Sequence, residues 1–149
     1  MPSSSIKKQI SCSKKNLINM VLDIENYPEF VPWCLGSKVY EKKDKGDTVE
    51  IIADLTIGKS FFRETYKSFV IYSKSADTIY VTSMEGPLKY LENKWFFKDL
   101  GESSQVEFQV DFELKNKMLN LFMNKSFDLG LIKIADAFQK RADELFNKT

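Results

Sequence analysis

The chain has 149 residues, which suffice for one domain spanning residues 1–149 and leave no room for a second core of ordinary size. Its 22 basic and 21 acidic residues give a net charge of +1, so the chain as a whole lacks the positive excess of a polyanion-binding protein. Only Arg63 and Arg141 among the basic residues are arginine, the side chain best suited to reading base edges. This composition argues against sequence-specific DNA binding.

Histidine is absent, which excludes Ser-His and Cys-His nucleophile pairs, histidine general bases and histidine-ligated zinc. The two cysteines, Cys12 and Cys34, do not make a zinc site, and we expect neither a metal nor another cofactor. No secretory signal is visible, and no stretch reaches the roughly 20 apolar residues that span a bilayer. We expect reduced thiols in a cytoplasmic protein, with a peripheral location at the inner membrane as the alternative.

The N-terminal third predicts one strand and two short helices. Residues 5–11 read as a strand, and Ser13 offers the N-cap of a helix whose apolar residues share one face. Tyr27-Pro28 is expected to end that helix, because a residue that precedes proline is pushed out of the α region. A second helical turn is expected over residues 28–33.

Six strands follow in hairpin order, because the apolar pattern changes to a period of two. The clearest alternation covers residues 105–114, which predicts a half-buried antiparallel strand. A turn is expected at Gly58-Lys59, and a bulge in residues 61–72, where apolar groups fall on both faces. The remaining predicted strands are residues 38–43, 48–57, 78–83 and 90–98.

The last third predicts one long helix over residues 117–147. Apolar residues at steps of three and four form a core stripe: Phe127, Leu131, Ile134, Phe138, Ala142 and Leu145. Gly130 is unusual inside this helix, where glycine costs about 1 kcal/mol relative to alanine. Close approach of a ligand or strand would explain it, and so would ordinary packing.

This element order predicts an α+β protein in which a curved antiparallel sheet of about seven strands wraps around the long C-terminal helix. Aromatic residues make up 13% of the chain, and such bulky side chains are difficult to pack without gaps. They form either an aromatic core or the wall of an apolar cavity between sheet and helix, and composition alone does not separate the two.

One block of sequence is specific enough to suggest a family. Residues 27–34 read Tyr-Pro-Glu-Phe-Val-Pro-Trp-Cys, and residues 86–91 read Gly-Pro-Leu-Lys-Tyr-Leu. Together these blocks resemble the coenzyme Q-binding START-domain family of the polyketide cyclase/START-like superfamily, which includes the RatA-type ribosome-association toxins. The resemblance runs over nearly the whole chain. Leu88 departs from it, because the family usually has an aromatic residue there.

The resemblance implies a START-like helix-grip fold with a cavity for a hydrophobic ligand, ubiquinone or a related isoprenoid lipid. It implies a non-enzymatic carrier or chaperone that supports respiration. The fold alone does not license that function, because START-like domains host unrelated activities.

The predicted ligand-binding residues line the expected hollow from several elements. Phe30 and Trp33 follow the short helices, where they either cap the core or gate access of the ligand. The others are inward-facing residues of the strands and of the last helix: Val49, Ile51, Leu55, Phe62, Glu64, Tyr66, Trp95, Phe97, Phe108, Val110, Phe112, Phe127, Leu131, Ile134 and Phe138. The pattern does not distinguish contact with a ligand from contact with the helix.

Glu64 has two interpretations. If Phe62, Glu64 and Tyr66 face inward, Glu64 is a cavity carboxylate that can accept a hydrogen bond from a ligand, or act as the general base of a cyclase or dehydratase. Otherwise it is a solvated surface residue. Tyr66, Tyr80 and Tyr90 are candidate phenol donors, but no catalytic constellation is visible and no catalytic residue is assigned.

Lysines cluster near the N-terminus and at the first hairpin, the latter group being Lys38, Lys42, Lys43 and Lys45. A solvated surface explains these clusters. Two alternatives assign the lysines a binding role: transient contact with an anionic membrane surface and docking on ribosomal RNA. The second alternative corresponds to a ribosome-associated regulator of subunit association, which is the main competitor of the lipid carrier.

Overall fold

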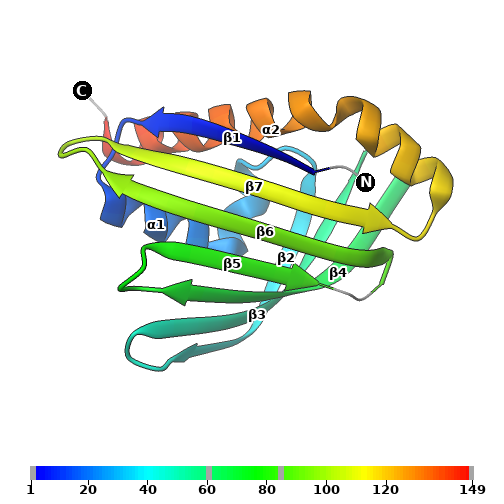
Figure 1. Ribbon diagram of the computed structural model, residues 1–149, viewed down its shortest axis with the longest axis horizontal. Coiled ribbons are helices and arrows are strands. Elements are labelled where there is room, and N and C mark those ends of the chain that lie inside the picture. The colour runs from blue at the N-terminus through cyan, green and yellow to red at the C-terminus, as the bar shows by residue number, and fades with distance from the viewer. Residues whose placement is uncertain (1–2, 60–61, 84–85, 148–149) are drawn as a thin grey trace.

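The structure, a computed structural model, describes residues 3–59, 62–83 and 86–147, without the side chains of residues 3, 59, 62, 119 and 122–128. Figure 1 shows a curved sheet with the long C-terminal helix lying along one side of it. The elements follow in the order β1 (Ser3–Ile10), α1 (Lys14–Leu22), the 3-10 helix η1 (Ile24–Glu29), β2 (Cys34–Asp44), β3 (Thr48–Lys59), β4 (Phe62–Ser73), β5 (Thr78–Ser83), β6 (Leu88–Asp99), β7 (Ser104–Leu114) and α2 (Lys117–Phe146).

The sheet has seven strands in the order β1-β7-β6-β5-β4-β3-β2, with every neighbouring pair antiparallel. Strands β2 to β7 therefore form a meander, and β1 is added at the β7 edge. The predicted α+β helix-grip architecture is confirmed. Alternation in β7 is complete, with each even-numbered residue from Ser104 to Leu114 buried, as the period-two pattern predicted.

Helix α1 begins where the sequence predicts. The Ser13 side chain accepts a hydrogen bond from the Asn16 N–H at 3.2 Å, which satisfies one of the free donors of the first turn. Leu17, Ile18 and Val21 are buried on the face that packs on the sheet. The capping residue and the apolar face together account for this short helix.

The segment after α1 differs from the prediction. The helix ends at Leu22, six residues before the proline, and Pro28 lies inside η1. The predicted stop at Tyr27-Pro28 is therefore wrong, and the predicted second short helix is present as η1, at residues 24–29 instead of 28–33. The Tyr27 hydroxyl donates to the Val21 carbonyl, and this link ties η1 back to the end of α1.

Strand β3 is two residues longer than predicted, and the pairing of β3 with β4 is more regular than predicted. The two strands pair without a register shift from Thr48↔Ser73 to Lys59↔Phe62, so the expected bulge in residues 61–72 is wrong. The apolar groups on the outer face of β4 are simply half-exposed, as Phe69 and Ile71 show at 38% and 40%. The predicted turn at residues 58–59 lies inside β3, where Gly58 donates to the Trp33 carbonyl at 3.0 Å.

Helix α2 lies against β1 and β7, and it buries Leu131, Phe138 and Ala142. Its predicted core stripe does not reach Leu145, which is 49% exposed. The last turn has passed the end of β1, where Asn147 donates to the Ser11 carbonyl at 2.7 Å.

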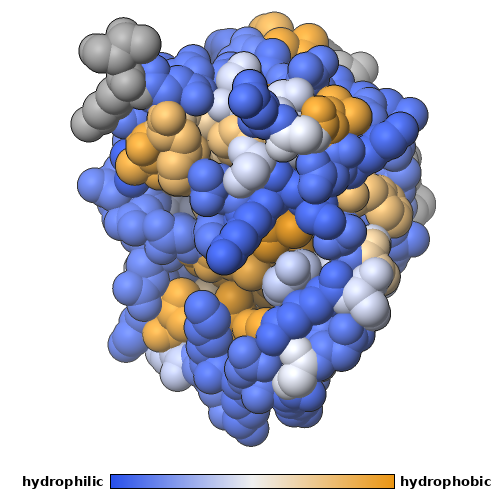
Figure 2. Space-filling view, turned by 90° about the vertical axis from the view of Figure 1, so that its left-hand side faces the viewer, coloured by the Kyte–Doolittle hydropathy of each residue, from blue (hydrophilic) through white to orange (hydrophobic). Residues whose placement is uncertain are grey.

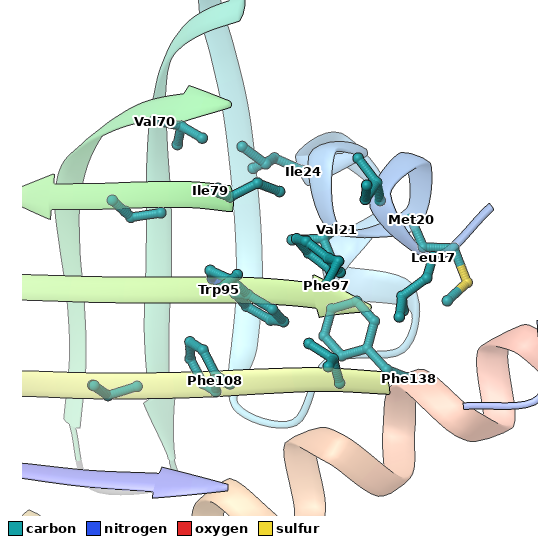
Figure 3. Close-up of a cluster of buried hydrophobic side chains, with 14 of the residues drawn as sticks. Leu17, Met20, Val21, Ile24, Val70, Ile79, Trp95, Phe97, Phe108 and Phe138 are labelled. Atoms are coloured by element: carbon teal, nitrogen blue, oxygen red, sulfur yellow. The ribbon is translucent and has the colours of Figure 1, made fainter. Parts of the chain in front are cut away.

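A hydrophobic core fills the space between α1, α2 and the middle of the sheet. Figure 3 shows Val21 of α1 directed at Phe97 of β6, with Leu17 and Trp95 in the same cluster. Phe138 of α2 reaches the same cluster, with its ring centroid 5.6 Å from that of Trp95 in an edge-to-face arrangement. Both helices thus pack on one face of the sheet, which is its concave face.

Candidate ligand-binding site

The concave face of β3 is closed along its first half and more open along its second half. Val49, Ile51 and Ala53 are at most 6% exposed, whereas Leu55 and Ile57 on the same face are half-buried. Among the described elements, helix α2 packs mainly on β1 and β7. An apolar wall therefore remains partly uncovered toward the end of β3.

Strand β4 continues this wall. Leu55 pairs with Tyr66 and Ile57 pairs with Glu64, and directly paired residues of antiparallel strands share a face. Tyr66 and Glu64 are half-buried, and the side chain of Phe62 lies outside the described residues. The register therefore places Glu64 on the concave face, as one of the two interpretations requires.

Trp33 connects the edge of the sheet to α2. Its φ is 64°, in the left-handed region that a large side chain rarely adopts. A Cβ atom added to Gly130 would lie 3.2 Å from the Cη2 and Cζ3 atoms of the indole. The glycine inside the helix is therefore explained by ordinary packing, because it makes room for Trp33.

Phe30 is held in an aromatic cluster. Its ring centroid lies 5.1 Å from that of Phe138 and 6.0 Å from that of Tyr27, both in edge-to-face geometry. The Arg141 guanidinium lies 5.1 Å from the centroid of the Phe30 ring and contacts Glu29 at 3.3 Å. The segment that carries the family-like motif is thus anchored on α2 by Phe30.

Close packing dominates where α2 meets β6 and β7. An apolar void remains there, lined among others by Trp95, Phe108, Ile134 and Phe138, with a volume of about 10 Å³. That volume holds about one water molecule. Sheet and helix therefore interlock at this end, and an isoprenoid ligand needs the more open part of the concave face.

The surface of the molecule shows a second sign of incomplete filling. Figure 2 shows a hollow with a hydrophobic floor and a hydrophilic rim. It lies on the side of the molecule that carries α1 and the β2–β3 and β4–β5 turns, the left-hand side of Figure 1. Apolar surface is therefore accessible from this side.

The predicted site residues fall into three groups by burial. The buried group is Val49, Ile51, Trp95, Phe97, Phe108, Val110, Phe112, Leu131 and Phe138. The half-buried group is Phe30, Trp33, Leu55, Glu64, Tyr66 and Ile134. The side chains of Phe62 and Phe127 lie outside the described residues. Contact of any of these residues with a ligand stays a prediction.

Sequence reasoning missed several polar groups on the concave face. Ser68 and Ser83 are each 1% exposed, and their Oγ atoms, like Oγ of Ser37 and Oδ1 of Asn93, are buried without a hydrogen-bond partner in the described part of the chain. A serine in a strand attracts no notice in a sequence. The signal that could have identified these residues is their position in the strand, because each lies where the alternation places an apolar residue.

The tyrosines differ in the face that they occupy. Tyr66 alone of the three candidate donors lies on the concave face, and burial raises its pKa. Tyr80 is 37% exposed. Tyr90 donates to Asp111 at 3.0 Å; desolvation first and this carboxylate second raise its pKa to about 12. Of these three tyrosines, only Tyr66 is placed to donate to a ligand within the concave face.

The cysteines lack the features of reactive thiols. Burial is the main cause that raises the pKa of both Cys12 and Cys34, which disfavours the nucleophilic thiolate. Over residues 3–59, 62–83 and 86–147, no group of three or more cysteine, aspartate or glutamate side chains is arranged to hold a metal ion. None of the described helices is long and apolar enough to cross a membrane.

Comparison with known families gives a match over most of the chain. The family described as polyketide cyclase / dehydrase and lipid transport matches residues 16–139. The chain is 29% identical to a protein of Rickettsia prowazekii named ribosome association toxin RatA, over 88% of this chain and 89% of that protein. It is 27% identical to a mitochondrial coenzyme Q-binding protein of Dictyostelium discoideum, over 95% of this chain and 69% of that protein.

A solved structure supports the same relationship. The solution structure of an 18 kDa protein from Caulobacter crescentus superposes with a TM-score of 0.81 at 30% identity, and the match covers 99% of this chain and all of that one. The similarity thus extends over the sheet and both helices.

Proposed function

This chain belongs to the polyketide cyclase / dehydrase and lipid transport family, and on that basis we propose that it binds ubiquinone or a related isoprenoid lipid as a non-enzymatic carrier or chaperone supporting respiration. The observation that carries the proposal is the partly uncovered apolar wall at Leu55, Ile57 and Tyr66. The similarity to a relative named as a coenzyme Q-binding protein supports the choice of ligand.

The energetics of such a site favour a long apolar ligand. Each buried CH₂ group contributes about 0.8 kcal/mol to transfer from water, so a tail of a few isoprene units supplies most of the binding free energy. Apolar contact is not directional, and a small number of polar groups is enough to orient the head of the ligand. The concave face has this composition.

The chemistry of the concave face supports a binding role. Among the described residues on the inward positions of β3 to β7, the carboxylates are Glu64 and, at the exposed end of β6, Asp99. Catalysis would need a second acid or base beside Glu64. The candidate on this face is Tyr66, whose pKa is raised by burial. General acid–base catalysis at neutral pH needs groups whose pKa lies near 7, and a neutral phenol is better suited to hydrogen bonding.

The test is direct identification of the bound molecule. The protein is purified without detergent, and its organic extract and its native mass are measured by mass spectrometry. We expect an isoprenoid quinone or related lipid at a stoichiometric level, and a higher melting temperature when a short-chain ubiquinone is added. A protein that is repeatedly free of lipid, with an unchanged melting temperature, would contradict the proposal.

A second candidate function rests on the relatives named ribosome association toxin RatA. The exposed lysines of β2 and its hairpin favour it, although two of them are paired: Lys43 with Glu41 at 3.0 Å and Lys45 with Glu50 at 3.1 Å. Co-sedimentation with ribosomal subunits over a salt series tests this function. Association that weakens with salt and with Lys42→Glu supports it, and no association at low salt removes it.

A further inference from the structure

The concave face carries a strip of unpartnered polar atoms inside an otherwise apolar surface. The strip consists of Ser68 on β4, Ser83 on β5 and Asn93 on β6. A buried polar group without a partner costs about 1–3 kcal/mol, and native proteins satisfy at least nine in ten such groups. Several unpartnered polar atoms on one face of one sheet are therefore not expected by chance.

Strand register makes these residues neighbours. Phe69 pairs with Thr82, so Ser68 and Ser83 occupy the next paired position on the same two strands. Ser83 pairs with Leu91 and Val81 with Asn93, which puts Asn93 on the diagonal from Ser83. Paired Cβ atoms lie about 5 Å apart, and the strip crosses three strands over about 10 Å.

The surroundings of the strip are apolar. Ser68 pairs with Ala53 and Asn93 pairs with Val110, and both of these partners are buried. The Tyr66 phenol lies within reach of the Ser68 hydroxyl, but the two do not meet the geometry of a hydrogen bond. Alanine or valine at these positions would fill the face without the cost of a buried unpaired oxygen.

We propose that Ser68, Ser83 and Asn93 form the subsite that binds the oxygenated head of the hydrophobic ligand. The inference rests on the proposed ligand-binding function and assigns a direction to it. The two serine hydroxyls donate to oxygen atoms of the head, and Asn93 Oδ1 accepts from a hydroxyl. The tail runs past Tyr66 toward the more open wall at Leu55.

This arrangement predicts a preference among ligand heads. A quinone ring offers only acceptors, so it satisfies the two serines and leaves Asn93 Oδ1 without a donor. A ring that bears a hydroxyl group, such as a quinol or a phenol, satisfies all three. Because Ser68 and Ser83 are each 1% exposed, covering side chains must shift when the head enters.

The experiment compares three probes that share one tail: decylubiquinone, its reduced quinol and decylbenzene, which lacks head oxygens. The variants are Ser68→Ala, Ser83→Ala and, as the matched control, Ser104→Ala. Ser104 is equally buried, at 0% exposure, but its hydroxyl donates to the Cys12 carbonyl at 2.9 Å. Dissociation constants are measured by intrinsic tryptophan fluorescence, and stability is measured by thermal unfolding.

We expect Ser68→Ala and Ser83→Ala each to weaken quinol binding about tenfold, which corresponds to one hydrogen bond, with decylbenzene binding unchanged. Neither variant should lower the melting temperature, whereas Ser104→Ala should lower it and leave affinity unchanged. Asn93→Leu should remove the preference for quinol over quinone.

Two results would overturn the inference. In one, Ser68→Ala and Ser83→Ala bind all three probes as the wild type does. In the other, they lose affinity for decylbenzene as much as for quinol, which indicates a structural role. A wild type that binds none of the probes instead refutes the proposed function itself, so the two failures are distinguishable.

Discussion

The contact between Trp33 and Gly130 makes a quantitative prediction about how the family-like motif is attached to α2. An alanine Cβ at position 130 would lie 3.2 Å from two atoms of the indole, which is closer than ordinary van der Waals contact at 3.4–4 Å. Overpacking of this kind costs about 1–3 kcal/mol. Replacing glycine by alanine inside a helix raises the free energy of unfolding by about 1 kcal/mol through helix propensity. Gly130→Ala alone should therefore lower the free energy of unfolding by about 0–2 kcal/mol.

The sign should reverse when the indole is removed. Trp33→Ala keeps a Cβ atom at the residue whose φ is 64°, so backbone strain is unchanged while the clash disappears. In that background Gly130→Ala should raise the free energy of unfolding by about 1 kcal/mol. Urea denaturation of the four proteins closes a double-mutant cycle with a coupling energy of about 1–3 kcal/mol.

A matched control uses another glycine near the same segment. A Cβ at Gly36 would lie 3.8 Å from Thr56 Cβ and has no contact with Trp33 within 4 Å. Gly36→Ala and Trp33→Ala should therefore be additive within about 0.5 kcal/mol. Additivity of Gly130→Ala with Trp33→Ala would refute the account of how Trp33 is seated.

The remaining predictions concern stability. Ser13→Ala should lower the free energy of unfolding by about 1 kcal/mol, measured by urea denaturation, because the hydrogen bond to the Asn16 N–H is lost. Phe138→Ala should cost about 3–5 kcal/mol because the ring is 3% exposed, whereas Phe146→Ala, at 40% exposure, should cost far less; equal losses would contradict the core assignment. Burial raises the pKa of Tyr27 and Tyr66 above the unfolded value of 10.0, so the stability that they contribute is complete below pH 10 and is lost as the pH rises above it. Thermal unfolding from pH 8 to 11 should therefore show a steeper loss in the wild type than in Tyr66→Phe.

The sheet was predictable because its pattern is local. In β7 the alternation of buried and half-buried residues follows the sequence from Ser104 to Leu114, since one face meets the core along its whole length. In β4 the same reasoning wrongly predicted a bulge, because Phe69 and Ile71 are apolar and lie on the outer face. A period-two pattern cannot identify the inner face when both faces carry apolar groups.

The prediction for the segment after α1 was wrong for a different reason. Its path depends on the hydrogen bond from the Tyr27 hydroxyl to the Val21 carbonyl and on the packing of Phe30 against Phe138. The second of these contacts joins residues more than one hundred positions apart in the chain. The motif could be recognised from the sequence, but the geometry that it adopts is set by tertiary contacts.

The candidate site was predicted in part for the same reasons. The register places Glu64 and Tyr66 on the concave face, which is one of the two alternatives that the sequence left open. The polar strip was missed because a buried serine and an exposed serine look alike in a sequence. Its recognition required the burial of Ser68 and Ser83 and the pairing of their strands.

The most direct test of ligand binding on the concave face is a methyl NMR titration of the isotope-labelled protein with decylubiquinol. The account predicts chemical-shift changes at Leu55 and Ile57 on the partly uncovered wall, and little change at Ile71 on the outer face of β4. Changes confined to Ile71 and its neighbours, or no saturable change at any methyl group, would contradict it.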